Sequence, residues 1–210
     1  MSPAPDVDLV APGVFIWQNY DPAVKADLFS TAIETEAGLF MVDPIELEEG
    51  ALHFLTNGRK VAGIIVSNAN HIRAAGQFAR NFSVRIFAHP RLATTSEFGV
   101  DVALSENEGP AKDLRVIFID GAAVGEIALH CQREEGTLVL GDALINFGSH
   151  GFDFLPAKYC SNTKQMRRSL KKLLDIDFER VFFAHGMPIL VSGRARLEAL
   201  LNKNADAIRP

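Results

Sequence analysis

"VAGIIVSNANHIRAAGQFARNFSVRIFAHP", residues 61–90, contains two apolar runs separated by a segment with helical periodicity. The runs "VAGIIVS" and "VRIFAHP" have the composition of strands that are buried on both faces of a sheet. A helix that connects two such strands crosses over the sheet and leaves the strands parallel. The stretch therefore predicts a βαβ unit over residues 60–90, with its helix beginning near Ile72.

Upstream of this unit, the sequence predicts an antiparallel meander. The runs "GVFIWQN", "LFSTAIET" and "LFMVD" are short and apolar, and turn residues such as Pro12-Gly13 and Ala37-Gly38 separate them. Turn residues of this kind punctuate strands that pair with their neighbours in sequence. The segment "ELEEGALHFLTNG" then spaces its leucines as a helix does and ends on Asn57-Gly58, which is typical of a helix terminus.

Downstream of the βαβ unit, strands return, and each half of the chain ends in helices. The runs "LRVIFID", "EIALHCQ", "TLVLGD" and "FERVFFAHG" predict strands, with a hairpin turn at Glu134-Glu135-Gly136. Amphipathic segments predict helices that begin near Asn162 and near Ser192. This order favours an α/β four-layer αββα sandwich, in which two sheets pack face to face with helices outside. We expect a single domain over residues 1–210.

The bulk composition favours a soluble, cytoplasmic protein. The 210 residues are 48% hydrophobic with a net charge of −5, which argues against disorder and against a nucleic-acid partner. Cys131 and Cys160 form neither a CxxC pair nor a CxxH spacing, so neither a zinc site nor a disulfide framework is indicated. The N-terminus lacks the features of a signal peptide. No apolar run approaches the roughly 20 residues that span a bilayer, so we expect no membrane partner.

Four local motifs, in this order, resemble those of the metallo-β-lactamase superfamily. "LFMVDPI" is similar to the family's strand that ends in Asp-Pro or Asp-Thr, and "IIVSNANHIRAAGQF" to its strand, T-H-x-H-x-D-H-x-G-G loop and helix. "DGAAVGEIAL" resembles the G-H-T-P-G-S stretch, and "TLVLGD" and "RVFFAHG" resemble the strands that deliver a bridging aspartate and a last histidine. The resemblance extends from about Val14 to Leu201. It implies a metallo-β-lactamase-like αββα fold, whereas function depends on the site.

The resemblance also implies a two-metal site, most of whose ligands this sequence lacks. The alignment places the family's two glycines on Ala75 and Gly76. The seven ligand positions then fall on Asn68, Asn70, Ile72, Arg73, Ala122, Asp142 and His185. Isoleucine and alanine cannot bind a metal ion, asparagine is a weak neutral ligand, and arginine adds a positive charge where a cation should bind. Only Asp142 and His185 retain the family's ligand type.

These losses predict a vestigial pocket without a metal cofactor. The main interpretation is a protein that is metal-free and catalytically silent, or that binds a small molecule or a protein partner in the same cleft. Because Asp142 is left without its cation, we expect Arg73 to point into the old site. Its guanidinium would pair with Asp142 directly or through one water, since it offers a planar fork of donors.

His71 leaves an alternative open. It lies one residue after the second ligand position, and in an extended loop it should point away from the pocket of Asn70. A one-residue shift would instead bring His71, Asp142 and His185 together, the minimum ligand set for catalytic zinc. The alternative is thus an atypical mononuclear hydrolase of an ester, thioester or lactone, with one Zn, Fe or Mn ion. A third interpretation is a protein with a purely structural role that pairs with an active relative through its fold.

Overall fold

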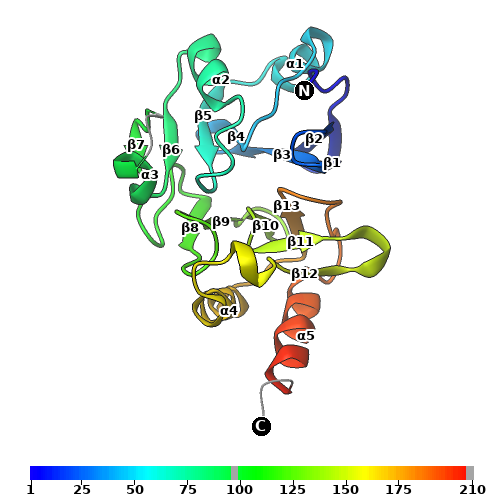
Figure 1. The fold of residues 1–210 in the computed structure, drawn as a ribbon. Coiled ribbons are helices and arrows are strands. Elements are labelled where there is room, and N and C mark those ends of the chain that lie inside the picture. Colours follow the sequence, from blue (N-terminus) through cyan, green and yellow to red (C-terminus); the bar gives the residue numbers. More distant parts are fainter. Residues whose placement is uncertain (96–98, 207–210) are drawn as a thin grey trace.

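Two stacked β-sheets form the centre of the molecule. The computed structural model describes residues 1–95 and 99–206. The large sheet has the order β1-β2-β3-β4-β5-β6-β7, and the small sheet the order β13-β10-β9-β8 (Figure 1). The large sheet comprises β1 (Asp8–Ala11), β2 (Val14–Asp21), β3 (Ala26–Thr35), β4 (Gly38–Val42), β5 (Val61–Val66), β6 (Ile86–Ala88) and β7 (Val102–Ala103). The small sheet comprises β8 (Leu114–Phe118), β9 (Ile127–Cys131), β10 (Thr137–Leu140) and β13 (Arg180–Phe183).

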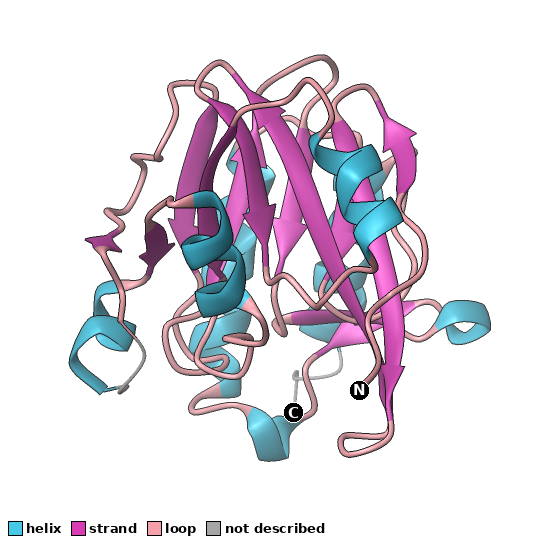
Figure 2. Cartoon of the chain, turned by 90° about the horizontal axis from the view of Figure 1, so that it is seen from above, coloured by secondary structure: helices cyan, strands magenta, loops and turns pink. Residues whose placement is uncertain are grey.

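Helices cover the outer face of each sheet. Those of the first half are α1 (Glu49–Thr56), α2 (Ala75–Phe82) and α3 (Pro90–Thr95), and those of the second half are α4 (Thr163–Lys171) and α5 (Gly193–Asp206). The described residues of the second half also form three short 3₁₀ helices, η1 (Gly148–His150), η2 (Ala157–Tyr159) and η3 (Lys172–Asp175), and a small hairpin of β11 (Leu144–Asn146) and β12 (Phe152–Phe154). Figure 2 shows helices lying across the strands of the sheets.

Three apolar layers separate the four layers of secondary structure. Side chains alternate along each strand, so Phe40 packs between the sheets while its neighbour Met41 faces α1 and α2. The same division holds for Ile65 and Ile64 on β5. Beneath the small sheet, a third cluster buries residues such as Met166 of α4. The predicted αββα sandwich is therefore confirmed.

The predicted βαβ unit and the meander are both present. β2, β3 and β4 pair antiparallel, whereas β4, β5 and β6 pair parallel. The helix of the βαβ unit begins at Ala75, not near Ile72, because Asn68–Asn70 form a turn and Arg73 has a φ of 42°. These residues lengthen the loop that precedes the helix. They also allow the loop to direct several polar side chains towards the sheet edge.

The predicted helix near Asn162 begins at Thr163, with Asn162 as its N-cap. The Asn162 side-chain oxygen accepts a hydrogen bond from Gln165 N at 3.0 Å. Asn162→Ala should therefore destabilise the protein by about 1 kcal/mol in urea unfolding. Asn162→Asp keeps the acceptor and should stay within about 0.5 kcal/mol of the wild type. Equal unfolding midpoints for the alanine variant and the wild type would show that the cap contributes nothing.

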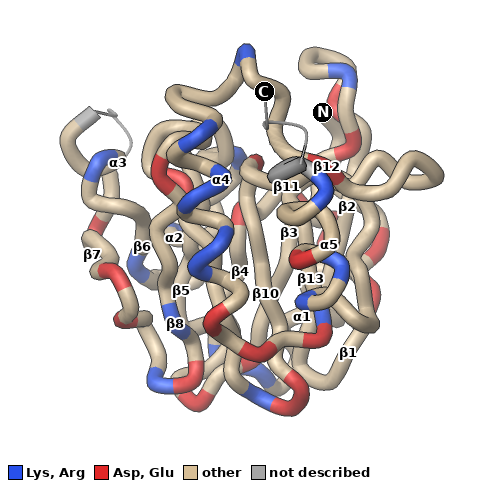
Figure 3. The backbone as a smooth tube through the Cα atoms, turned by 90° about the horizontal axis from the view of Figure 1, so that it is seen from below, with Lys and Arg blue, Asp and Glu red and all other residues tan. Residues whose placement is uncertain are grey.

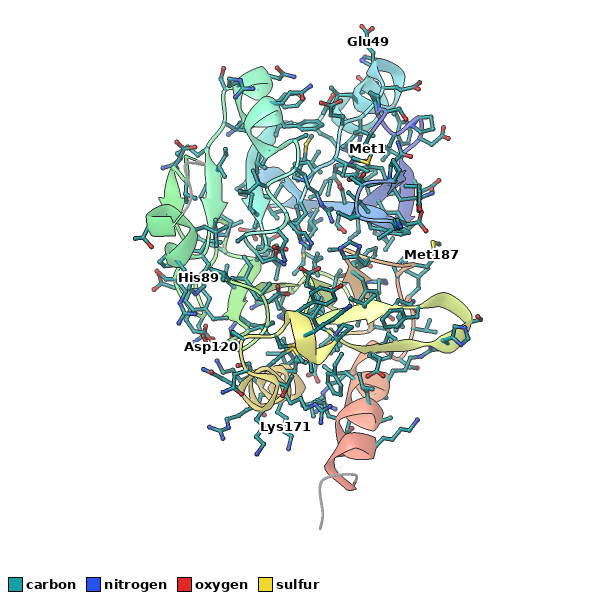
Figure 4. All side chains as sticks on the ribbon, in the orientation of Figure 1. Met1, Glu49, His89, Asp120, Lys171 and Met187 are labelled. Carbon is teal, nitrogen blue, oxygen red and sulfur yellow. The ribbon has the colours of Figure 1, made fainter. Side chains whose placement is uncertain are left out.

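The basic residues of α4 and η3 lie on the outer side of the molecule, as their helical spacing predicts. Arg168, Lys171 and Lys172 are exposed, and Arg167 packs over the ring of Phe154 at 4.7 Å. Figure 3 shows Lys and Arg residues along α4, and Figure 4 shows Lys171 and Glu49 on opposite outer faces of the sandwich. Within residues 1–95 and 99–206, no helix is long and apolar enough to cross a membrane.

Candidate metal and ligand site

Polar residues follow four strands at the points where these strands end. β4 and β5 are parallel neighbours in the large sheet, and β10 and β13 are parallel neighbours in the small sheet. Asp43 follows β4, His71 lies in the loop after β5, Asp142 follows β10 and His185 follows β13. The carboxyl ends of parallel strands lie at the same edge of a sheet, where α/β proteins commonly bind ligands. Because the sheets are stacked, the four side chains meet at one edge of the sandwich.

His71 points into this edge and is buried between two carboxylates. Its Nδ1 lies 2.9 Å from Asp43 Oδ2 and its Nε2 lies 3.1 Å from Asp142 Oδ1, with the His71 side chain only 3% exposed. The expectation that His71 points away from the pocket of Asn70 is wrong. That expectation assumed an extended loop, but His71 N donates to Asn68 O at 3.1 Å across a turn. Strand alternation does not apply across such a turn.

Asp142 lies at the centre of the site, and its two carboxylate oxygens have different neighbours. Oδ2 accepts hydrogen bonds from the side-chain amides of Asn70 at 3.1 Å and Asn68 at 3.3 Å. Oδ1 instead lies 3.1 Å from His71 Nε2 and 3.4 Å from His185 Nε2. The asparagines therefore fix the orientation of the carboxylate, and its other oxygen faces the two imidazole rings.

In each of the two histidine rings, Nδ1 has a partner that determines which ring nitrogen carries the proton. His71 Nδ1 donates to the Asp43 carboxylate, and His185 Nδ1 donates to the carbonyl oxygen of Asp27 at 3.1 Å. In a neutral ring this leaves the lone pair on Nε2. Metal-binding histidines usually have such a carboxylate or carbonyl partner on their second nitrogen. Both Nε2 atoms are thus prepared to act as ligands.

Three donor atoms converge as ligands of one cation do. One ligand atom each from His71, Asp142 and His185 all lie within 4.8 Å of one another. Metal–ligand bonds of about 2.0–2.2 Å place neighbouring donors roughly 3–3.5 Å apart, which matches the contacts of Asp142 Oδ1. His71 Nε2 makes no hydrogen bond of acceptable geometry with any described residue, despite its distance of 3.1 Å from Oδ1. A single ion fits this donor set.

The positions aligned with the family's other ligands lie in different surroundings among the described residues. Asn68 is fully buried and uses its amide N–H groups as donors, and Ala122 is buried in the apolar cluster under the small sheet. Ile72 packs against the core beneath α1 and α2 and lines a neighbouring pocket. Of the seven aligned positions, Asn70, Arg73, Asp142 and His185 line the same cleft, together with His71.

Arg73 forms different contacts from those expected. Its Nη1 donates to the carbonyl oxygens of Phe29 at 2.6 Å and Asp43 at 3.0 Å, and Nη2 donates to Ala184 O at 3.4 Å. The predicted direct pair with Asp142 is wrong, since no ion pair joins the two side chains among the described residues. Carbonyl oxygens from three segments at the sheet edge accept the hydrogen bonds of the guanidinium fork instead. Arg73 thereby connects the large sheet with the small one.

The charges in the site are strongly coupled. Burial and the nearby Arg73 guanidinium lower the pKa of His71, but Asp43 and Asp142 outweigh them and raise it to about 9. Burial alone would raise the pKa of Asp142, yet the neighbouring His71 and His185 rings hold it well below its usual range. Without an ion, the site binds a proton on His71 at neutral pH. A metal ion must compete with that proton.

Several residues of this network received no functional role from sequence reasoning. Asp43 belongs to the quoted motif "LFMVDPI", and its position directly after a strand could have indicated a partner for His71. Glu126 is buried beneath the site, where burial and the charge of Asp142 raise its pKa to about 8. It directly precedes the apolar run of β9, and nothing in its local sequence distinguishes it from a surface carboxylate.

A cleft of about 1050 Å³ opens onto the site. Its floor includes His71, Asp142 and His185. One wall comes from Val24 in the β2–β3 connection and Leu28 near the start of β3, and the other from the segment after β10. The apolar residues of that second wall are Ile145, Phe147, Leu155 and Tyr159. The cleft can therefore hold a small molecule with an apolar body and a polar group at the floor.

Comparisons with known proteins agree with this architecture. The family model described as the metallo-beta-lactamase superfamily matches residues 7–204. A comparison with curated proteins gives no match.

Solved structures share the fold at low sequence identity. A metallo-beta-lactamase from Pontibacter korlensis is 15% identical with a TM-score of 0.71, and the alignment covers 94% of this chain and 98% of that one. A beta-lactamase domain protein from Burkholderia ambifaria is 19% identical with a TM-score of 0.70, covering 99% and 79%. A metallo-beta-lactamase family protein from Thermus thermophilus is 20% identical with a TM-score of 0.66, covering 94% and 81%.

Proposed function

Because the chain belongs to the metallo-beta-lactamase superfamily, we propose that it is a hydrolase with a single metal ion. The ion would be held by His71, Asp142 and His185. The observation that carries this proposal is the pair of Nε2 atoms beside Asp142 Oδ1, each ring fixed through its Nδ1. His71 takes part although it does not occupy one of the family's usual ligand positions.

The proposed substrate is a small ester, thioester or lactone with an apolar body. A bound divalent ion polarises a carbonyl oxygen and lowers the pKa of water. The residues of this chain bind and orient the substrate: Leu28 and Phe147 contact its apolar part from opposite walls, and Asn70 keeps Asp142 in place. The same proposal includes one domain over residues 1–210, a cytoplasmic location and no nucleic-acid partner.

A second candidate function is metal-free binding of a small molecule in the same cleft. It is favoured by the contacts of His71 with carboxylates on both sides, because a proton on Nε2 can supply the charge that an ion would supply. It is also consistent with the loss of five family ligands at the seven aligned positions. The two candidates differ in one measurable property, the metal content of the protein.

Metal analysis therefore tests the proposed function. After incubation with Zn²⁺ and gel filtration, we expect roughly one ion per chain, since three protein ligands are sufficient for a catalytic site. His185→Ala should reduce the content to a small fraction, whereas His53→Ala, on the exposed side of α1, should not. Chelation should remove hydrolysis of p-nitrophenyl esters. A wild-type protein with well under one equivalent of any divalent metal would contradict this proposal and favour metal-free binding.

A further inference from the structure

Glu126 is a buried carboxyl group for which the proposed function leaves no role. It is 2% exposed and directly precedes β9, beneath the proposed ion site. Its position is fixed by the backbone, because Ile119 N donates to Glu126 O at 2.9 Å and Ile127 N donates to Ser67 O at 2.9 Å. A buried carboxyl group on a rigid element is costly unless it is hydrogen-bonded, so its partners call for a functional explanation.

The two oxygens of Glu126 bind the two loops that carry proposed metal ligands. Oε1 accepts a hydrogen bond from Ala143 N at 2.9 Å, and Ala143 directly follows Asp142 in sequence. Oε2 accepts a hydrogen bond from Asn68 Nδ2 at 2.7 Å. Each loop therefore has one of its polar groups fixed by the same side chain.

Asn68 connects Glu126 with the turn that carries His71. Its side-chain oxygen accepts a hydrogen bond from Asn70 N at 2.8 Å, and its carbonyl oxygen accepts one from His71 N at 3.1 Å. The interior is closely packed here, because a Cβ at Gly141 would lie 2.6 Å from Ser67 Oγ and 2.8 Å from Glu126 Oε1. The chain of hydrogen bonds thus runs from Ala143 through Glu126 and Asn68 to the His71 turn.

We infer that Glu126 is a positioning residue that sets the separation of His71 and Asp142, an inference that rests on the proposed function. His71 and Asp142 come from different sheets, so their separation depends on the contact between the loops. Glu126 bridges these loops with two hydrogen bonds on a side chain that cannot move into solvent. Outer partners of metal ligands typically change metal affinity by about 10–100-fold when they are removed.

The test compares Glu126→Ala and Glu126→Gln with the control Glu106→Gln. Glu106 also accepts a hydrogen bond from a backbone N–H, that of Phe118 at 2.7 Å, but it is partly exposed and is not among the residues that line the cleft. Two properties are measured for each variant: the affinity and visible spectrum of bound Co²⁺, and the amide hydrogen exchange of Ala143 and Asn70 in metal-free protein. The urea midpoint reports on the stability of each variant.

Glu126→Ala should weaken Co²⁺ binding about 10–100-fold and should accelerate exchange at both amides. Glu126→Gln keeps an acceptor for only one of the two partners, so one of the two amides should remain protected while the Co²⁺ spectrum changes. Glu106→Gln should alter neither property. If Glu126→Ala does not fold, the Co²⁺ binding and amide hydrogen exchange of Glu126→Gln test the inference.

Exchange rates and Co²⁺ affinities within about two-fold of the wild type in both Glu126 variants, far below the effect expected of an outer partner, would overturn the inference. A wild-type protein that binds no Co²⁺ counts against the proposed function instead. In that case exchange at Ala143 and Asn70 still decides whether Glu126 fixes the two loops.

Discussion

Replacing His71 with alanine should destabilise the metal-free protein by about 3–5 kcal/mol at neutral pH. The ring lies between Asp43 and Asp142, and both carboxyl groups are buried. Its removal leaves two buried carboxylates without the cation that lies between them, and removal of one partner of a buried ion pair is strongly destabilising. Urea unfolding in the presence of a chelator measures the loss.

Two variants separate this effect from a general loss of packing. His53→Ala, on the exposed side of α1, should change stability by less than about 0.5 kcal/mol. His71→Ala/Asp142→Asn removes one of the two uncompensated charges and should recover part of the loss. If the double variant is no more stable than the single one, charge compensation is not the reason for the effect.

The contribution of His71 should also disappear at alkaline pH. Its folded-state pKa of about 9 lies above its ordinary value of 6.5. The stabilisation is therefore fully present below pH 6.5 and is lost as the pH rises through about 9. Urea midpoints of the chelated wild type should fall over this range more steeply than those of His71→Ala. Parallel pH profiles for the two proteins would show that His71 is not charged in the folded state.

The second large effect is expected for Arg73, whose guanidinium donates to carbonyls of both sheets. Arg73→Ala should cost about 2–4 kcal/mol, because hydrogen bonds from a charged donor each contribute about 1.5–3 kcal/mol and are not additive. The carbonyl oxygens of Asp43 and Ala184 would keep their other donors, Ser30 Oγ and Phe29 N, so the expected cost comes from the lost hydrogen bonds of the guanidinium. Urea unfolding at neutral pH checks the magnitude.

The backbone at Arg73 offers an internal control. Its φ of 42° is unfavourable for any residue with a Cβ, so Arg73→Gly should be more stable than Arg73→Ala by up to about 1 kcal/mol. Arg80→Ala changes an exposed residue of α2, the helix that follows, and should cost less than about 0.5 kcal/mol. A loss for Arg73→Ala as small as that for Arg80→Ala would show that the guanidinium does not connect the sheets.

Local patterns were sufficient to predict the architecture of this protein. The apolar runs before and after residues 67–85 identify parallel strands, and β5 and β6 pair in that way. Turn residues identified the meander, and amphipathic spacing identified α4 and α5. Such patterns succeed because burial alternates along a strand or follows the helical period, so each segment indicates its own buried face.

The sequence also determined which chemical groups are available at the sheet edge. Alignment alone excludes Ile72 and Ala122 as ligands, and it identifies Asp142 and His185 as retained ligand types. These conclusions depend only on residue type and on position relative to a strand end. Neither requires a knowledge of side-chain direction.

Tertiary structure alone decided how those groups are paired. Sequence spacing placed His71 outside the pocket, but the turn at Asn68–Asn70 directs it between Asp43 and Asp142. Arg73 binds carbonyls from three separate segments, and Glu126 joins loops that are far apart in sequence. Side-chain alternation extends only as far as the strand does, and beyond its end the direction of a side chain depends on the turn and on partners supplied by distant segments.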